Sequence, residues 1–237
     1  MTILLAASLL PPLYLLWKVY QSDKIEKEPR SLLFTIFLFG MLSTLPAGIL
    51  EGIGELVLSY FPIWNFMPEG VAMRVFNLLF YFIVVGGSEE YVKYQAMKRP
   101  TWHNPEFNYV FDGVVYGVTA SLGFAALENI MYVFDTGLLT AGVRAWTAIP
   151  LHCIAGIFMG HYYGIARAAE MWNEFQIRDQ MLRRSILIPM IIHGAYDFIA
   201  SDESEILSIL FFVYIVILDV VALRSLKKYS RNDVRMF

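Results

Sequence analysis

Seven long apolar stretches, separated by short polar linkers, constrain the fold of this chain more than any other feature. Each is close to the roughly 20 apolar residues that a helix needs to cross a bilayer. Only 16% of the 237 residues are charged, against about 25% in soluble domains. Backbone groups in lipid must bond internally, so such stretches are expected to be helices. The predicted helices cover about 1–20, 31–50 (extending toward 60), 71–97, 109–134, 143–168, 185–200 and 205–224.

These stretches predict one all-α unit, a polytopic membrane helix bundle with about seven transmembrane helices. The mean hydropathy of +0.54 agrees with this class. No repeat or low-complexity tract divides the chain, so we expect a single integral-membrane domain over residues 1–237. Its chemistry-bearing motifs fall within about 85–200, and a short basic tail follows at 225–237. The expected surroundings are the lipid bilayer, and nothing in the sequence points to nucleic acid.

Lysine and arginine mark alternate linkers, which predicts the orientation in the membrane. The first, third and fifth linkers and the tail are basic, whereas the second, fourth and sixth are nearly free of Lys and Arg. Cytoplasmic loops carry the excess of positive charge. We therefore expect a multi-pass protein of the cell membrane, with an extracytoplasmic N-terminus and a cytoplasmic C-terminus.

Several ionisable or polar residues interrupt the apolar stretches. A charge near the bilayer centre costs several kcal/mol, so such residues indicate a functional site by default. Each alone has a structural explanation, such as a helix-surface pair or a packed histidine. Together, spread over four consecutive predicted helices, they favour function. They are Glu89, Glu90, Lys93, Glu128, Asn129, His152, His193 and Asp197.

Three other acidic residues are expected to be structural or solvated. Asp112 lies near the cytoplasmic boundary, where it would be solvated or cap a helix. Glu51 and Glu55 lie near the outer end of the second helix, where water would reach them.

Helical spacing predicts which of these side chains meet. His193 and Asp197 are one turn apart, so the carboxylate can orient the imidazole. Glu89 and Lys93 share a face in the same way, whereas Glu90 points about 100° away from Glu89. Counting residues from the helix ends places the site in the central to outer half of the membrane, provided that the third helix is long.

Two chemistries use such a set of side chains. In one, a glutamate activates water as general base and histidines stabilise the oxyanion. In the other, two histidines and a glutamate bind Zn²⁺, and another glutamate accepts the proton of the metal-bound water. The second is narrowly favoured, because a His₂Glu set leaves one coordination position open for water.

The metal hypothesis assigns a role to each residue. Zn²⁺ would be held by Glu128, His152 and His193, with Glu89 or Glu90 as general base. Asp197 would fix the tautomer of His193. Lys93 and Asn129 would support the site.

Four sequence blocks resemble, in order and spacing, the motifs of the PrsW family of bacterial intramembrane proteases. The blocks are GGSEEYVK, FDGVVYGVTASLGFAALENI, PLHCIAGIFMG and IIHGAYDF. The PrsW family is related to the CAAX prenyl endopeptidase and Abi group. The wider CAAX pattern has Arg at the position of Lys93, His at that of Glu128 and commonly Asn at that of Asp197.

The resemblance implies a membrane-embedded protease that performs site-1 cleavage. PrsW proteins cut a single-pass anti-sigma factor on its extracytoplasmic side, and a second intramembrane protease then completes release of the sigma factor. The substrate implied here is therefore a single-pass membrane protein similar to an anti-sigma factor (RsiW-like).

Three alternatives remain open from the sequence. One is a CAAX-type or Abi-type peptidase acting on prenylated or peptide substrates. Another is a proton-coupled transporter using the buried Glu and His as a relay, although no inverted repeat is visible. A third is a scaffold without catalytic activity, which would tolerate substitution of Glu89, Glu128 or His193.

Overall fold

The computed structural model describes residues 1–202 and 204–236, and within this part every regular element is a helix. The π-helix η2 joins α3 to α4 without a loop. In chain order the elements are α1 (Thr2–Ser22), α2 (Arg30–Ser59), η1 (Pro62–Phe66), α3 (Glu69–Leu79), η2 (Phe80–Val85), α4 (Gly86–Thr101), α5 (Val110–Thr136), α6 (Leu138–Trp146), α7 (Ala148–Met171), α8 (Phe175–Ala200) and α9 (Glu205–Arg231).

The prediction of an all-α membrane bundle is confirmed. In the described part of the chain, six helical segments are long and apolar enough to cross a membrane, and the third runs continuously over Gly70–Thr101. The predicted sixth span forms the second half of α8. The first half of α8 carries Arg178, Arg183 and Arg184, so its apolar content is low although the helix continues.

Two helix boundaries differ from the sequence-based prediction. The predicted helix 143–168 is divided, because α6 ends at Trp146 and α7 begins at Ala148. Thr147 between them has φ −124° and ψ −78°, which is not helical. The predicted helix 185–200 begins earlier, at Phe175. Polarity marks where a helix leaves the apolar region, and it does not mark where the helix ends.

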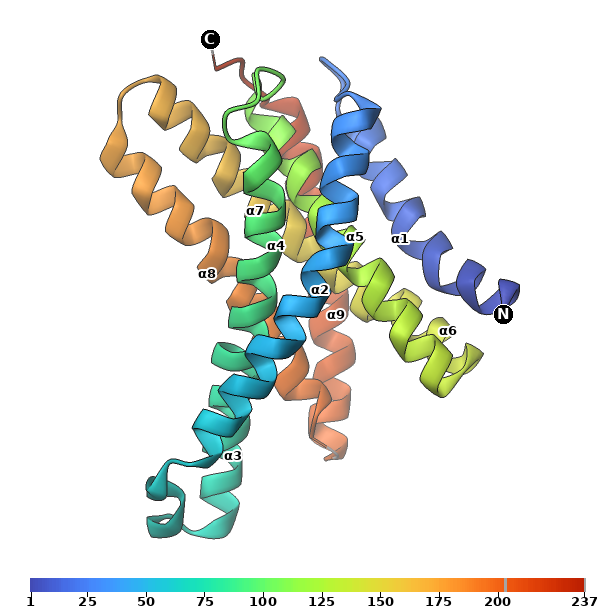
Figure 1. Cartoon of the computed structure of the whole chain (residues 1–237), viewed down its shortest axis with the longest axis vertical. Helices are drawn as coiled ribbons and strands as arrows, with labels where there is room; N and C mark the ends of the chain where they lie inside the picture. The colour runs from blue at the N-terminus through green and yellow to red at the C-terminus, as the bar shows by residue number, and fades with distance from the viewer. Residues whose placement is uncertain (203, 237) are drawn as a thin grey trace.

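α5 lies at the centre of the bundle, with α1, α2, α4 and α7 packed around it (Figure 1). Its contact with α7 depends on glycine. A Cβ added to Gly160 would lie 2.0 Å from the backbone oxygen of Gly113, and one added to Gly117 would lie 2.5 Å from that of Gly156. Small residues four apart let helix backbones approach closely in membranes. This close approach brings the polar residues of α5 and α7 together.

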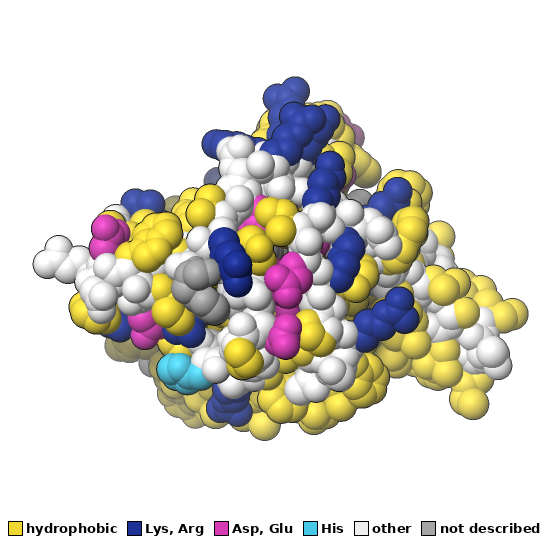
Figure 2. Space-filling view, turned by 90° about the horizontal axis from the view of Figure 1, so that it is seen from above, with side chains coloured by type: hydrophobic (Ala, Val, Ile, Leu, Met, Phe, Trp, Pro, Cys, Tyr) yellow, Lys and Arg dark blue, Asp and Glu magenta, His cyan; other side chains and the backbone are white. Residues whose placement is uncertain are grey.

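The basic linkers lie at one end of the bundle. The α1–α2, α4–α5 and α7–α8 connections and the C-terminus all lie at the top of Figure 1, whereas the N-terminus lies away from this end. Figure 2 shows Lys and Arg side chains gathered around this end, with acidic side chains between them. That this end faces the cytoplasm remains a prediction from charge.

Buried carboxyl groups join the linkers at this end. Asp112 caps α5, because its Oδ2 accepts the backbone N–H groups of Asn108 (3.0 Å) and Tyr109 (2.7 Å). The capping expected of Asp112 is therefore confirmed, but the side chain is buried rather than solvated. The Tyr116 hydroxyl donates to Glu28, and burial raises the pKa of Glu28 to about 7.

Candidate active site

The first part of the site is formed by α4, directly after the π-helix η2. π-helical turns are rare and often occur at functional sites. Glu89, Glu90 and Lys93 are buried in the membrane-spanning part of the chain. The Lys93 ammonium lies 2.8 Å from Glu89 Oε2 and 2.8 Å from Glu90 Oε1. Although the two glutamates leave the helix in different directions, their long side chains reach the same cation.

The second part is His152, in the first two turns of α7. Its Nδ1 lies 3.0 Å from Lys93 Nζ, and its Nε2 lies 2.9 Å from Glu128 Oε2. An ammonium group has donors only, so Nδ1 must accept and Nε2 must carry the proton that it donates to Glu128. The Arg144 guanidinium from α6 holds Glu128 in turn, at 2.6 Å.

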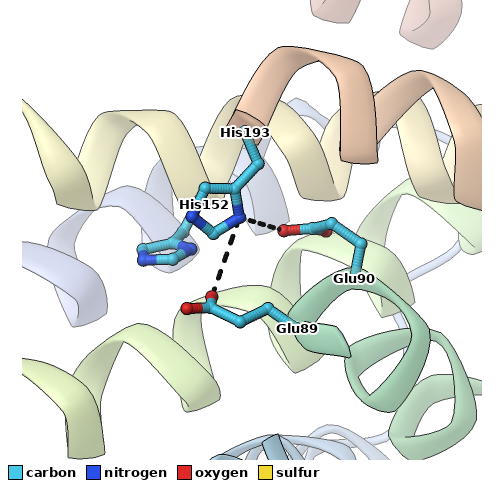
Figure 3. Close-up of side chains that lie close together, drawn as sticks. All are labelled: Glu89, Glu90, His152 and His193. Carbon is cyan, nitrogen blue, oxygen red and sulfur yellow. Dashed lines mark hydrogen bonds and ion pairs between the residues drawn. The ribbon is translucent and has the colours of Figure 1, made fainter. Parts of the chain in front are cut away.

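The third part is His193, on α8. Its Nδ1 lies 2.7 Å from Glu90 Oε1 and 3.7 Å from Glu89 Oε2 (Figure 3). Its Nε2 lies 3.3 Å from Asp197 Oδ2, which is ion-pair distance without the geometry of a hydrogen bond. The predicted face shared by His193 and Asp197 is thus present.

The two imidazole rings are oriented alike relative to α4. His152 Nδ1 contacts Lys93, His193 Nδ1 contacts Glu90 and Glu89, and the Nε2 of each ring faces a further carboxylate, Glu128 or Asp197. In metal sites the ring nitrogen that does not ligate usually bonds to a carboxylate, a carbonyl or water, which fixes the tautomer and ring orientation. The two rings are 5.2 Å apart between centroids and nearly perpendicular.

Glu89, Glu90, His152 and His193 fit a divalent metal ion. One ligand atom of each lies within 4.8 Å of the others, and all four residues are buried. Glu90 Oε2 is buried without a hydrogen-bond partner among the described residues, so an acceptor is available. Nitrogen and carboxylate donors are the set that zinc uses in catalytic sites. Lys93 Nζ contacts three of the four residues and supplies the positive charge beside them.

The structure does not group the candidates as the sequence suggested. Glu128, predicted as a metal ligand, is not in the four-residue cluster, because it lies behind His152. Asn129 is buried and lies outside the cluster, where its Nδ2 donates to the Ser8 carbonyl and its Oδ1 accepts from Arg144.

Sequence reasoning missed two residues near the site. Arg144 was not among the predicted site residues, and Glu51 was expected only to meet water near the outer end of the second predicted helix. Both line a cavity of about 370 Å³ beside the cluster, together with Glu89, Glu128, His193 and Asp197. No sequence motif surrounds Glu51, so only its depth in the membrane could have identified it as a residue near the site. The expectation of exposure holds for Glu55.

Known proteins resemble the chain over most of its length. The family model "PrsW family intramembrane metalloprotease" matches residues 28–223. The protein named Protease PrsW of Oceanobacillus iheyensis is 30% identical over 98% of each chain. That of Bacillus subtilis is 30% identical over 85% of this chain and 84% of its own. That of Geobacillus kaustophilus is 31% identical over 83% and 79%. No solved structure matches.

The family match includes all four chain segments that build the site, from Glu89 to Asp197. With the buried carboxylate and histidine cluster between membrane-spanning helices, it identifies the chain as a membrane protease. The chain therefore belongs to the PrsW family of intramembrane metalloproteases.

Proposed function

We propose that this protease makes the first cut in a single-pass membrane protein, of the anti-sigma-factor kind, and so starts regulated intramembrane proteolysis and sigma-factor release in a stress response. One observation supports the catalytic part most strongly. Two buried histidines each contact α4 through Nδ1, His152 at Lys93 and His193 at Glu90, and each turns Nε2 toward a further carboxylate, inside a membrane bundle. Such an arrangement fixes the tautomer and orientation of both rings, which a catalytic or metal-binding histidine needs and a histidine that only fills space does not.

The residues that would hold a metal are Glu90, His152 and His193, with Glu89 as the general base. When bound there, zinc supplies a water whose pKa is lowered to about 7. We assign Glu128 to orienting His152 rather than to ligation, because its Oε2 is shared by His152 and Arg144. Asp197 orients His193 in the same way.

The proton movements follow from the positions of these groups. Glu89 accepts a proton from the water that attacks the scissile carbonyl, and it then protonates the leaving amine as the C–N bond breaks. The Lys93 ammonium lies 2.8 Å from Glu89 Oε2, and this ion pair holds the carboxylate in position. The burial of the cluster limits bulk water around the developing oxyanion.

Cleavage on the extracytoplasmic side is supported by the position of the cluster along the helices. His152 lies near the start of α7, and His193 lies in the last third of α8. Both therefore lie nearer the non-basic end of the bundle than the end with the Lys and Arg side chains. With the basic end in the cytoplasm, the reaction takes place in the outer half of the membrane.

The metal-dependent assignment can be tested with purified protein in liposomes that also contain single-pass anti-sigma factors. We expect metal bound near one equivalent, loss of cleavage after chelation and its return on addition of Zn²⁺. His152→Ala should lose the metal together with activity. Full cleavage after exhaustive chelation would contradict the metal role, and absence of any cut in all substrates would contradict the substrate assignment.

A further inference from the structure

One carboxylate faces the active-site cavity without serving the proposed chemistry. Glu51, on α2, lines the cavity beside Glu89, Glu128 and Asp197. Each of the other three has a nitrogen partner: Lys93 for Glu89, Arg144 and His152 for Glu128, and His193 for Asp197. Among the described residues, Glu51 has neither an ion pair nor a hydrogen bond of its side chain. The described residues therefore supply no partner for the Glu51 carboxylate where it borders the cavity.

An uncompensated carboxylate is costly at this position. A charged side chain within a membrane span costs several kcal/mol unless it pairs with another group or faces water. Glu51 lies in the membrane-spanning helix α2, and its neighbour Glu55 is exposed at the surface of the same helix. A cation placed in the cavity would remove this cost for Glu51 and would not benefit Glu55.

The face of α2 around Glu51 is open enough to receive a peptide. Thr44, Ala47, Gly48 and Glu51 all line the cavity, and their spacing places them on one helical face. A Cβ added to Gly48 would meet no atom within 4 Å, so the space beside it is free. The part of the cavity wall that α2 forms therefore consists of small side chains and one carboxylate.

The charge of the cavity selects the occupant. Its lining has four carboxylates, Glu51, Glu89, Glu128 and Asp197, against one guanidinium, Arg144, which is already bound to Glu128, and the two imidazoles of His152 and His193. Complementary charge gives specificity at such sites, and a like charge placed there is repelled. An acidic side chain of a substrate in this cavity would lie near the carboxylate of Glu51 and those of the other lining residues.

On the basis of the proposed proteolytic function, we infer that Glu51 is a specificity residue that binds a lysine or arginine side chain of the substrate near the scissile bond. The substrate class is then a single-pass membrane protein with a basic residue beside its cleavage site. Glu51 acts on substrate binding and takes no part in bond breaking.

A charge-swap experiment tests this inference. A set of quenched fluorescent peptides is made from one parent sequence. Each peptide carries Lys, Gln or Glu at one of the four positions on either side of the cleaved bond. At one position, wild type should prefer Lys over Glu by about tenfold in kcat/KM, the ratio that about 1.4 kcal/mol of contact energy gives. Glu51→Gln should remove the preference mainly through KM, and Glu51→Lys should reverse it toward the Glu peptide.

Glu55→Gln is the matched control, because it removes the same charge from an exposed position one turn further along α2. It should keep the wild-type preference. Recovery of the Glu peptide by Glu51→Lys also shows that this variant is folded. Efficient cleavage by wild type with no charge preference at any position would overturn the inference alone. Failure of wild type to cut any peptide or membrane substrate would overturn the proposed function and the inference together.

Discussion

At the scale of single residues, the site depends on groups that hold other groups in place. Glu128 accepts the Nε2 proton of His152, and this leaves Nδ1 as the acceptor that faces Lys93. A neutral amide in place of Glu128 can keep the shape but supplies a weaker acceptor and an alternative donor. The tautomer of His152 would then be less well defined.

Glu128→Gln is therefore expected to lower both metal affinity and kcat, by about 10- to 100-fold, as losses of such orienting carboxylates do. Asp135→Asn is the control, because Asp135 lies exposed near the end of the same helix. The measurements are metal titration and cleavage kinetics in liposomes. Unchanged metal affinity and kcat in Glu128→Gln would contradict the orienting role.

Lys93 and a bound metal would contact the same atoms. The Lys93 ammonium lies within 3.0 Å of Glu89 Oε2, Glu90 Oε1 and His152 Nδ1, and the ring of Phe124 lies 4.2 Å away. Two cations that share these partners repel each other. Metal binding therefore requires the ammonium to withdraw, and the lysine is expected to weaken binding.

Lys93→Met should bind zinc more tightly than wild type, as measured by competition with a chromophoric chelator. Its cleavage rate should fall, because Glu89 loses the ion-pair partner that positions its carboxylate. Lys98→Met, on the same helix and outside the cluster, should leave the affinity unchanged. Weaker zinc binding by Lys93→Met than by wild type would show that the ammonium assists the site instead.

At the scale of elements, the α5–α7 contact determines whether His152 reaches Glu128. The contact is close because glycines face each other across it. Gly160→Ala would place a methyl group 2.0 Å from the Gly113 backbone oxygen, which forces the two helices apart. Such overpacking costs about 1–3 kcal/mol.

We expect Gly160→Ala to lower the thermal unfolding midpoint in detergent micelles and to reduce cleavage, because the helices that carry His152 and Glu128 separate. Gly142→Ala, where the added Cβ meets nothing within 4 Å, should be as stable as wild type or slightly more so. An unchanged midpoint for Gly160→Ala would show that α5 and α7 do not pack this closely.

The linker between α1 and α2 should make stability depend on pH. Burial raises the pKa of Glu28 from 4.5 to about 7, opposed by its hydrogen bond from Tyr116, and burial raises that of Asp23 to about 6. The folded chain therefore binds these protons more tightly than the unfolded chain. Their contribution to stability is complete below about pH 4.5 and is lost as pH rises through about 7.

The thermal unfolding midpoint of the wild-type protein should decrease as the pH is raised from 5 to 8. Glu28→Gln should make this decrease smaller, and the part that remains should come from the other buried carboxyl groups at this end of the bundle, Asp23 among them. Glu26→Gln, at an exposed position in the same linker, should behave as wild type. A midpoint that rises from pH 5 to pH 8 in wild type would contradict the sign.

Much of the fold could be predicted at this scale because lipid leaves few options for an apolar chain. The apolar runs found each membrane-spanning region, from α1 to α9. They could not find the break at Thr147, since α6 and α7 are both apolar. They also missed the early start of α8, where the residues are charged but helical.

The sequence singled out most residues of the candidate site, but it did not show which of them contact each other. Buried Glu and His residues stand out in an apolar sequence because of their cost in lipid. Which of them touch depends on the crossing of four helices, which spacing within one helix does not determine. Arg144 shows this limit, because its partner Glu128 lies on a different helix, beyond the reach of any local motif.

At the scale of the whole molecule, the bundle places the candidate active site between helices and toward its non-basic end. α4, α5, α7 and α8 each supply part of the site, and α2 forms a further wall of the cavity. The bundle thereby provides a polar cavity within the membrane, where a peptide segment could meet the catalytic cluster. The central claim is that Glu89, Glu90, His152 and His193 hydrolyse a peptide bond there.

The most direct test is mass spectrometry of the products that purified protein forms from a single-pass membrane substrate in liposomes prepared with H₂¹⁸O. The account predicts one cut on the extracytoplasmic side of the substrate, with ¹⁸O in the new carboxyl terminus. It also predicts that folded Glu90→Gln and His193→Ala variants form no product. Cleavage by these two variants at the wild-type rate would contradict the account.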